Sequence, residues 1–93
     1  MIEWHVPNDN QLFFEEWEDE AVVYNSKSGE THRLNDLAAS LLKIIQRQPG
    51  SINLFTEQVN NLYEVEDQLD LERQLNGLIS QFDTLGLIEP LVE

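Results

Sequence analysis

The residues that could act as acids, bases, nucleophiles or metal ligands are two histidines, several hydroxyls and many carboxylates. His5 and His32 are far apart in the chain and share no spacing typical of metal ligands. The sequence has no cysteine, no GxSxG or HExxH motif and no glycine-rich phosphate loop. The stretch Asn8-Asp9-Asn10 lacks the glycine and the closing glutamate of a calcium-binding loop, so we expect a solvated turn there. The sequence therefore predicts a protein that is not an enzyme and that holds neither a metal nor a cofactor.

The charge balance is strongly acidic, with 18 Asp and Glu against 5 Lys and Arg and a formal net charge of -13. Such a charge repels phosphate polyanions and anionic lipid. No basic segment leads into an apolar run, and no apolar run approaches the roughly 18 residues of a membrane span. We therefore expect a cytoplasmic protein that binds no nucleic acid and no membrane. The carboxylates between residues 15 and 20 fit a solvated face that discourages aggregation of a strand edge.

The first half of the chain predicts three strands. Residues 12–17 are aromatic and acidic, and residues 21–25 are β-branched and aromatic. Residues 26–29 supply a turn of about four residues in which Gly29 suits a positive φ, and residues 30–34 resume an extended pattern. These features predict a β-hairpin joined to an earlier strand.

The second half predicts three helices. Asn35 can cap a helix with apolar residues at three- and four-residue spacing, which Gln48-Pro49-Gly50 ends. A second helix is expected over residues 53–63, capped by Ser51 or Asn53, with Phe55, Val59, Leu62 and Tyr63 on one side. A third helix, capped by Asp67 or Asp70, runs to Leu85, with Gly86 as its left-handed C-terminal residue and Leu87 packed back onto it. Residues 87–90 form either a short extended segment or a docked tail.

The order of these elements predicts an α+β fold in which a three-stranded antiparallel sheet precedes three helices, and we expect one domain over residues 1–93. A sheet this small must lay one face on the helices to be stable, and it leaves an edge free. On the last strand, His32 and Leu34 share one face while Thr31 and Arg33 share the other. Because Leu34 is apolar, we expect the first pair to face the helices.

Several short motifs point to a known family. A valine-rich strand carrying Tyr24 leads through a Ser/Gly turn to Thr31-His32-Arg33-Leu34, and the following helix opens with Leu37-Ala38-Ala39. The third helix closes with Leu85-Gly86-Leu87-Ile88. In these features the chain resembles the PqqD-like family over nearly its whole length, in particular the HPr-rel-A system PqqD-like subgroup.

The resemblance implies a winged-helix-like peptide-recognition domain that binds the leader segment of a ribosomally made precursor peptide and delivers it to a modifying enzyme. In that family the peptide lies as an extra strand along the second hairpin strand and against the third helix. The resemblance thus implies that the peptide-binding residues are Thr31, His32, Arg33, Leu34, Gln74, Leu78 and Gln81. Few basic residues are present to hold an acidic leader, so the expected partner is neutral or basic.

Two other functions fit the same elements. A structural subunit would use the free edge for a permanent protein partner or for its own copy, so self-association is compatible with the sequence. A DNA-binding winged helix needs a basic recognition helix, whereas Arg73 is the sole basic residue between residues 70 and 85.

Overall fold

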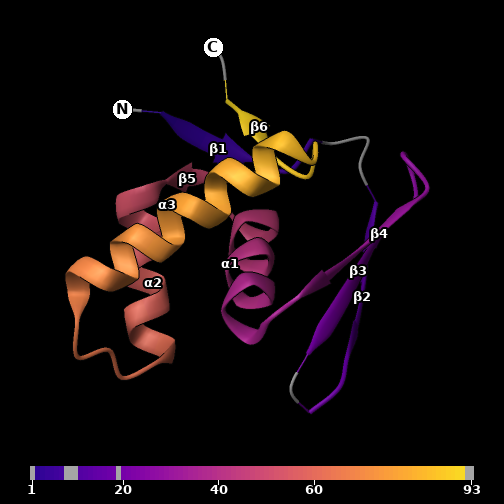
Figure 1. Ribbon diagram of the computed structural model, residues 1–93. Coiled ribbons are helices and arrows are strands. Elements are labelled where there is room, and N and C mark those ends of the chain that lie inside the picture. The colour runs from indigo at the N-terminus through magenta and orange to yellow at the C-terminus, as the bar shows by residue number, and fades with distance from the viewer. Residues whose placement is uncertain (1, 8–10, 19, 92–93) are drawn as a thin grey trace.

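The computed structural model describes residues 2–7, 11–18 and 20–91, and Figure 1 shows how its helices and strands are arranged. The expected turn at residues 8–10 lies outside the described residues, as does Asp19 of the acidic stretch. Along the described chain the elements are β1 (Glu3–His5), β2 (Leu12–Glu16), β3 (Ala21–Asn25), β4 (Glu30–Leu34), α1 (Asp36–Arg47), β5 (Gly50–Ser51), α2 (Ile52–Leu62), α3 (Gln68–Thr84) and β6 (Glu89–Pro90). The predicted α+β class, with a three-stranded antiparallel sheet followed by three helices, is confirmed.

The larger sheet has the strand order β2-β3-β4, so β4 lies at one edge and β2 at the other. Both pairings are antiparallel, with Val23 opposite Phe14 on one side and His32 on the other. Gly29 adopts the expected positive φ of 77°, and its N–H donates to the Asn25 carbonyl at 2.8 Å. Ala21, Val23 and Asn25 are buried while Val22 and Tyr24 are less so, which identifies the face that packs on the helices.

A second sheet, with the order β5-β1-β6, was not predicted from the sequence. Trp4 of β1 lies opposite Gly50 on one side and Pro90 on the other, and the Leu91 N–H donates to the Glu3 carbonyl at 2.8 Å. The strands of this second sheet have two or three residues each, which is too few to show an alternation of apolar and polar residues. Residues 87–90 are therefore not simply a docked tail, since Glu89 and Pro90 pair with β1.

Helix α1 lies between the larger sheet and the other helices (Figure 1). Its predicted cap is confirmed, because the Asn35 Oδ1 accepts from the Ala38 N–H at 2.8 Å. The helix ends at Arg47, just before Pro49, which cannot continue a helical hydrogen-bond ladder. Six of its residues are buried: Ala38, Ala39, Leu41, Leu42, Ile44 and Ile45.

Helix α2 starts at Ile52, and Ser51 rather than Asn53 caps it, accepting from the Leu54 N–H at 3.4 Å. The expected apolar side is correct for Phe55 and Val59, which are fully buried, but wrong for Leu62 and Tyr63, which are 63% and 38% exposed. Leu62 is the last residue of the helix, and Tyr63 lies beyond it where the chain is extended, so Tyr63 does not continue the apolar side of the helix. The Tyr63 hydroxyl instead forms a 2.7 Å hydrogen bond with the Ser40 hydroxyl on α1.

Helix α3 is capped by Asp67, whose Oδ1 accepts from the Asp70 N–H at 3.0 Å. At its other end Gly86 has a φ of 75°, and the Leu87 N–H donates to the Phe82 carbonyl at 2.9 Å. This is the bond that closes a helix with a left-handed terminal residue. Leu87 is fully buried in the hydrophobic core that also contains Phe82 of α3, which is consistent with the predicted packing of Leu87 back onto this helix.

Replacing Asn35 with alanine should lower the free energy of unfolding by about 1 kcal/mol, because the Ala38 N–H loses its acceptor. Urea denaturation followed by circular dichroism measures this difference. Asn35→Asp keeps an acceptor and should stay close to the parent protein. Equal stability of the alanine and aspartate variants would show that the cap contributes nothing.

Candidate functional site

The free edge of β4 exposes the backbone of two of the residues predicted to bind a peptide. The Trp17 N–H donates to the Glu20 carbonyl and the Ser26 N–H to the Gln11 carbonyl. Hydrogen-bonded pairs alternate in an antiparallel ladder. Residues 22 and 24 of β3 therefore bond to β2, and residues 21, 23 and 25 bond to β4. By the same alternation, Thr31 and Arg33 of β4 turn their N–H and C=O groups toward the open edge.

The side chains of β4 alternate between the two faces of the sheet. Leu34 is buried and His32 is half-buried, and His32 lies opposite the fully buried Val23. Thr31 and Arg33 are exposed on the other face, where the Arg33 guanidinium pairs with the Glu20 carboxylate at 2.6 Å. The predicted orientation of the two pairs of side chains is confirmed. The His32 Nε2 is buried and has no hydrogen-bond partner within the described part of the chain.

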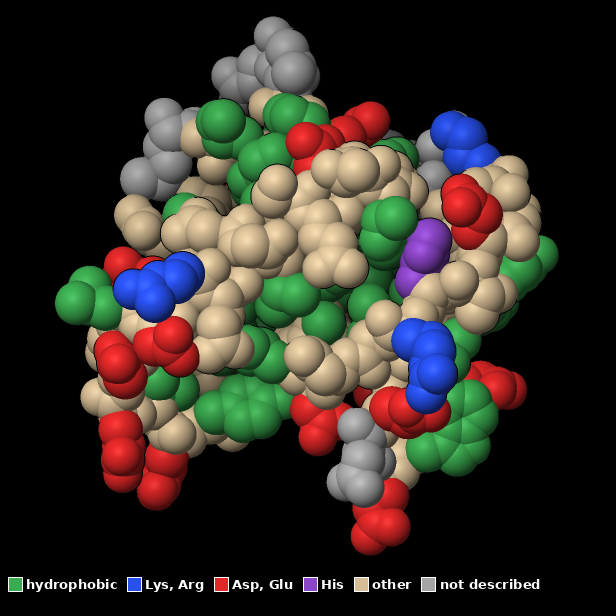
Figure 2. Space-filling model, in the orientation of Figure 1, with side chains coloured by type: hydrophobic (Ala, Val, Ile, Leu, Met, Phe, Trp, Pro, Cys, Tyr) green, Lys and Arg blue, Asp and Glu red, His purple; other side chains and the backbone are tan. Residues whose placement is uncertain are grey.

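A hollow separates α3 from the hairpin on the face shown in Figure 2, and hydrophobic side chains are visible on its floor. Figure 1 shows α1 behind this space, with α3 on one side and β4 on the other. On α3, Leu78 is half-buried against the core, and Gln74 and Gln81 are exposed. A strand added to β4 would thus lie between the hairpin and a helix that offers both apolar and amide side chains.

A cavity of about 510 Å³, here called the end pocket, lies where α1, α2, α3 and the α2–α3 connector meet. Its lining residues are Asp36, Leu37, Val59, Tyr63, Glu64, Val65, Glu66, Asp67, Asp70, Leu71 and Gln74. Asp36 and Leu37 follow β4 by two and three residues, so the pocket opens at the end of this strand. The structure thereby brings Gln74 into the same pocket as Asp36 and Leu37, whereas Leu78 and Gln81 do not line it.

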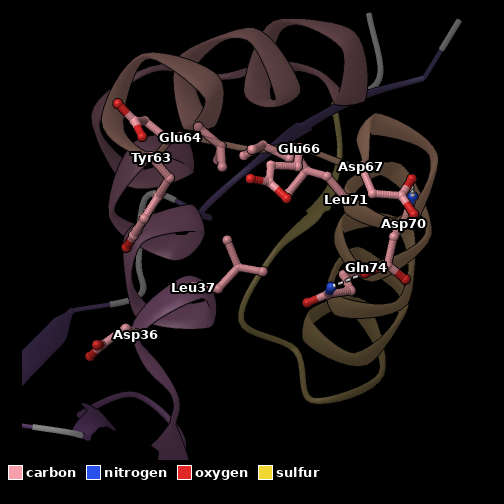
Figure 3. Close-up of a pocket in the computed structure, with 11 residues that line it drawn as sticks. Asp36, Leu37, Tyr63, Glu64, Glu66, Asp67, Asp70, Leu71 and Gln74 are labelled. Atoms are coloured by element: carbon pink, nitrogen blue, oxygen red, sulfur yellow. Dashed lines mark hydrogen bonds between the residues drawn. The ribbon is translucent and has the colours of Figure 1, made fainter.

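Figure 3 shows how the side chains of the end pocket are directed. Leu37 from α1 and Glu66 from the connector point toward one another, and the Gln74 amide points into the same space. Glu64 and Asp36 point away from it. The Gln74 Nε2 donates to the Asp70 Oδ2 at 2.7 Å, which fixes the amide at the wall.

Sequence reasoning missed most of the end pocket. Leu37 and Leu71 follow the same apolar spacing as core residues, and the connector over residues 64–68 contains mainly acidic and polar residues, so neither pattern indicates a pocket. One residue could have indicated the pocket. Val65 is an apolar residue between carboxylates, and it packs against the core, which places the connector at the pocket.

The outer face of the hairpin sheet carries a second exposed surface. Phe13, Trp17 and Tyr24 are 56%, 55% and 41% exposed, and the rings of Phe13 and Tyr24 lie 6.4 Å apart. Exposed aromatic residues of this kind are enriched at protein–protein contacts. This surface lies on the face of the sheet to which Thr31 and Arg33 also turn their side chains.

Within residues 2–7, 11–18 and 20–91, no three His, Asp or Glu side chains gather in a way that would hold a metal ion. His5 does form a 3.1 Å pair with Glu89, which joins β1 to β6. Among the described helices, none has the length and hydropathy needed to cross a membrane.

No family model and no curated protein sequence matches the chain. Two solved structures have a similar fold. The first is TbiB1 in complex with the TbiA(beta) leader peptide, with a TM-score of 0.71 and 15% identity, covering 96% of this chain and 99% of that chain. The second is lasso peptide synthetase B1 complexed with the leader peptide, with a TM-score of 0.69 and 23% identity, covering 94% of this chain and 98% of that chain. The protein therefore has the fold of these two proteins over nearly its whole length.

Proposed function

We propose that this protein is a PqqD-like peptide-binding adaptor, without catalytic activity of its own, that presents a precursor peptide to a modifying enzyme in the cytoplasm. The leader segment of the peptide adds a fourth strand to the larger sheet at β4. The observation that carries the proposal is the open edge at Thr31 and Arg33, which lies beside the hollow in front of α1. The two similar structures, both solved with leader peptides, support it.

The ladder geometry determines how the peptide would lie. Peptide residues opposite Thr31 and Arg33 exchange backbone hydrogen bonds with them, and their side chains emerge on the outer face of the sheet. The peptide residues at the alternate positions, opposite His32 and Leu34, turn their side chains into the hollow toward α3. The peptide is thus read at alternate positions, and the apolar floor of the hollow favours apolar residues there.

The energetics require side-chain contacts as well. Thr31 and Arg33 offer one N–H and one C=O each, and four backbone bonds at about 0.5–1.5 kcal/mol give roughly 2–6 kcal/mol in total. A micromolar dissociation constant needs about 8 kcal/mol, and ordering the peptide opposes binding. The hollow and the end pocket must therefore supply the remainder, which makes binding selective for sequence.

Selection of binding peptides from a random-sequence library by mRNA display tests this function. We expect enriched peptides with apolar residues at alternate positions and dissociation constants on the order of micromolar. NMR titration of a selected peptide should shift the amide signals of β4 and α3. Failure to select any binder, or shifts confined to α2 and residues 15–20, would contradict the proposal.

Duplex DNA should not bind at physiological salt. The net charge of -13 opposes the counterion release that drives such binding, and α3 carries Arg73 as its basic residue. A gel shift with submicromolar protein and a steep dependence on salt concentration would instead favour the DNA-binding alternative.

A permanent structural subunit is the second candidate, and the exposed Phe13, Trp17 and Tyr24 are the observation that favours it. Gel filtration with multi-angle light scattering distinguishes the two. An adaptor is expected to elute as a monomer near 10.8 kDa, whereas a stable dimer without any peptide would favour the structural role.

A further inference from the structure

The end pocket combines an apolar floor with an acidic rim. Leu37, Val59, Val65 and Leu71 supply apolar surface, and Val59 and Leu71 belong to the buried core. Asp36, Glu64, Glu66, Asp67 and Asp70 supply five carboxylates among the eleven lining residues, and no lining residue is basic. An occupant that matches both parts has a hydrocarbon stem and a positive charge at its tip.

The five carboxylates differ in whether they already have hydrogen-bond or ion-pair partners within the protein. Asp67 caps α3, and Asp70 accepts from Gln74 and lies 4.0 Å from the Arg73 guanidinium. Asp36, Glu64 and Glu66 have no ion-pair or hydrogen-bond partner among the residues that the structure describes. Of these three, Glu66 alone points toward the interior of the pocket in Figure 3.

The helix ends do not cancel this negative charge. The N-termini of α1 and α3 both lie at the pocket, and each contributes about half a positive elementary charge. Together they offset about one of the five carboxylate charges, so the field in the pocket stays negative. This field repels an anionic side chain, and a neutral apolar side chain would gain no ion pair with Glu66.

We propose that the end pocket binds a lysine or arginine side chain of the docked peptide, with its methylene stem against Leu37 and Leu71 and its charged group at Glu66. This inference rests on the proposed function, because a peptide strand that continues past Leu34 reaches Asp36 and Leu37 at the mouth of the pocket. Long basic side chains bury their stems while their charged ends stay near water, which suits a pocket with an open acidic rim. The pocket would then select peptides with a basic residue just beyond the paired segment.

Two small probes of the same shape test the pocket without a peptide. Pentylguanidinium and pentylurea differ mainly in charge, and both are too short to form a strand on β4. In NMR titrations, pentylguanidinium should shift the amide signals of Leu37, Val65 and Gln74 and bind at least about threefold more tightly than pentylurea, as expected for one screened ion pair.

Glu66→Gln should remove this preference for the charged probe. Glu64→Gln is the matched control, since it removes the same charge from a neighbouring side chain that points away, and it should keep most of the preference. The inference is overturned if pentylurea binds as tightly as pentylguanidinium, if neither probe shifts these amides, or if Glu66→Gln leaves the preference intact. Any of these results leaves strand addition at β4 untouched, whereas a peptide that fails to bind β4 would not alter the response to the probes.

Discussion

Replacing Arg33 with proline is expected to weaken binding of a selected peptide at least about tenfold. The Arg33 N–H faces the open edge of β4, so proline deletes a donor that the peptide needs and places its ring where the added strand must approach. The internal ladder to β3 does not use this N–H, and proline is tolerated on an edge strand in that orientation. Isothermal titration calorimetry measures the loss, and the thermal melt reports whether the fold is retained.

Arg33→Ala separates the backbone from the side chain. It removes the exposed pair with Glu20, which contributes about 1 kcal/mol or less, but keeps the N–H. The peptide should then bind within about threefold of the parent protein. If alanine weakened binding as much as proline did, the guanidinium rather than the strand edge would hold the peptide, and the strand-addition account would be wrong.

Replacing Phe82 with alanine is expected to lower the free energy of unfolding by about 3–5 kcal/mol. Phe82 is fully buried on α3, and its carbonyl accepts the bond from Leu87 that closes the helix. Since small domains have about 5–15 kcal/mol of stability, the melting temperature should fall by roughly 12 °C or more. The variant should also bind peptide more weakly, because the C-terminal half of α3 forms one wall of the hollow.

Ser80→Ala is the control for Phe82→Ala, since Ser80 lies on the exposed side of the same helical turn. It should change stability by about 0.5 kcal/mol or less. If Phe82→Ala melted within a few degrees of the parent protein, α3 would not be anchored through this side chain.

The elements that position the site were predictable because local residue types specify them. Gly29 suits the turn, and Asn35 caps α1. In each case the two residues that form the hydrogen bond are separated by only three or four positions in the chain. The orientation of Leu34 followed from alternation in an extended strand with one apolar face. The predicted hairpin follows an earlier strand, so its second strand was expected at the edge of the sheet, as the strand order β2-β3-β4 shows.

The rest depends on contacts between residues distant in sequence. Strand β1 is three residues long and pairs with segments near residues 50 and 90, which no local pattern reveals. The end pocket arises because α1, α2 and α3 converge, and apolar spacing alone does not distinguish a pocket wall such as Leu37 from the core. The exposure of Leu62 likewise reflects where α2 ends relative to its neighbours.

Amide hydrogen exchange, measured by NMR with and without a bound peptide, tests strand addition at β4 most directly. The Thr31 and Arg33 amides should exchange at least about tenfold more slowly in the complex, because each gains a carbonyl acceptor from the peptide. The opposite edge is an internal control, since alternation turns the Leu12, Phe14 and Glu16 amides of β2 away from β3. Their exchange should not change. Protection at β2 instead of β4, or unchanged exchange at Thr31 and Arg33 in a saturated complex, would contradict the account.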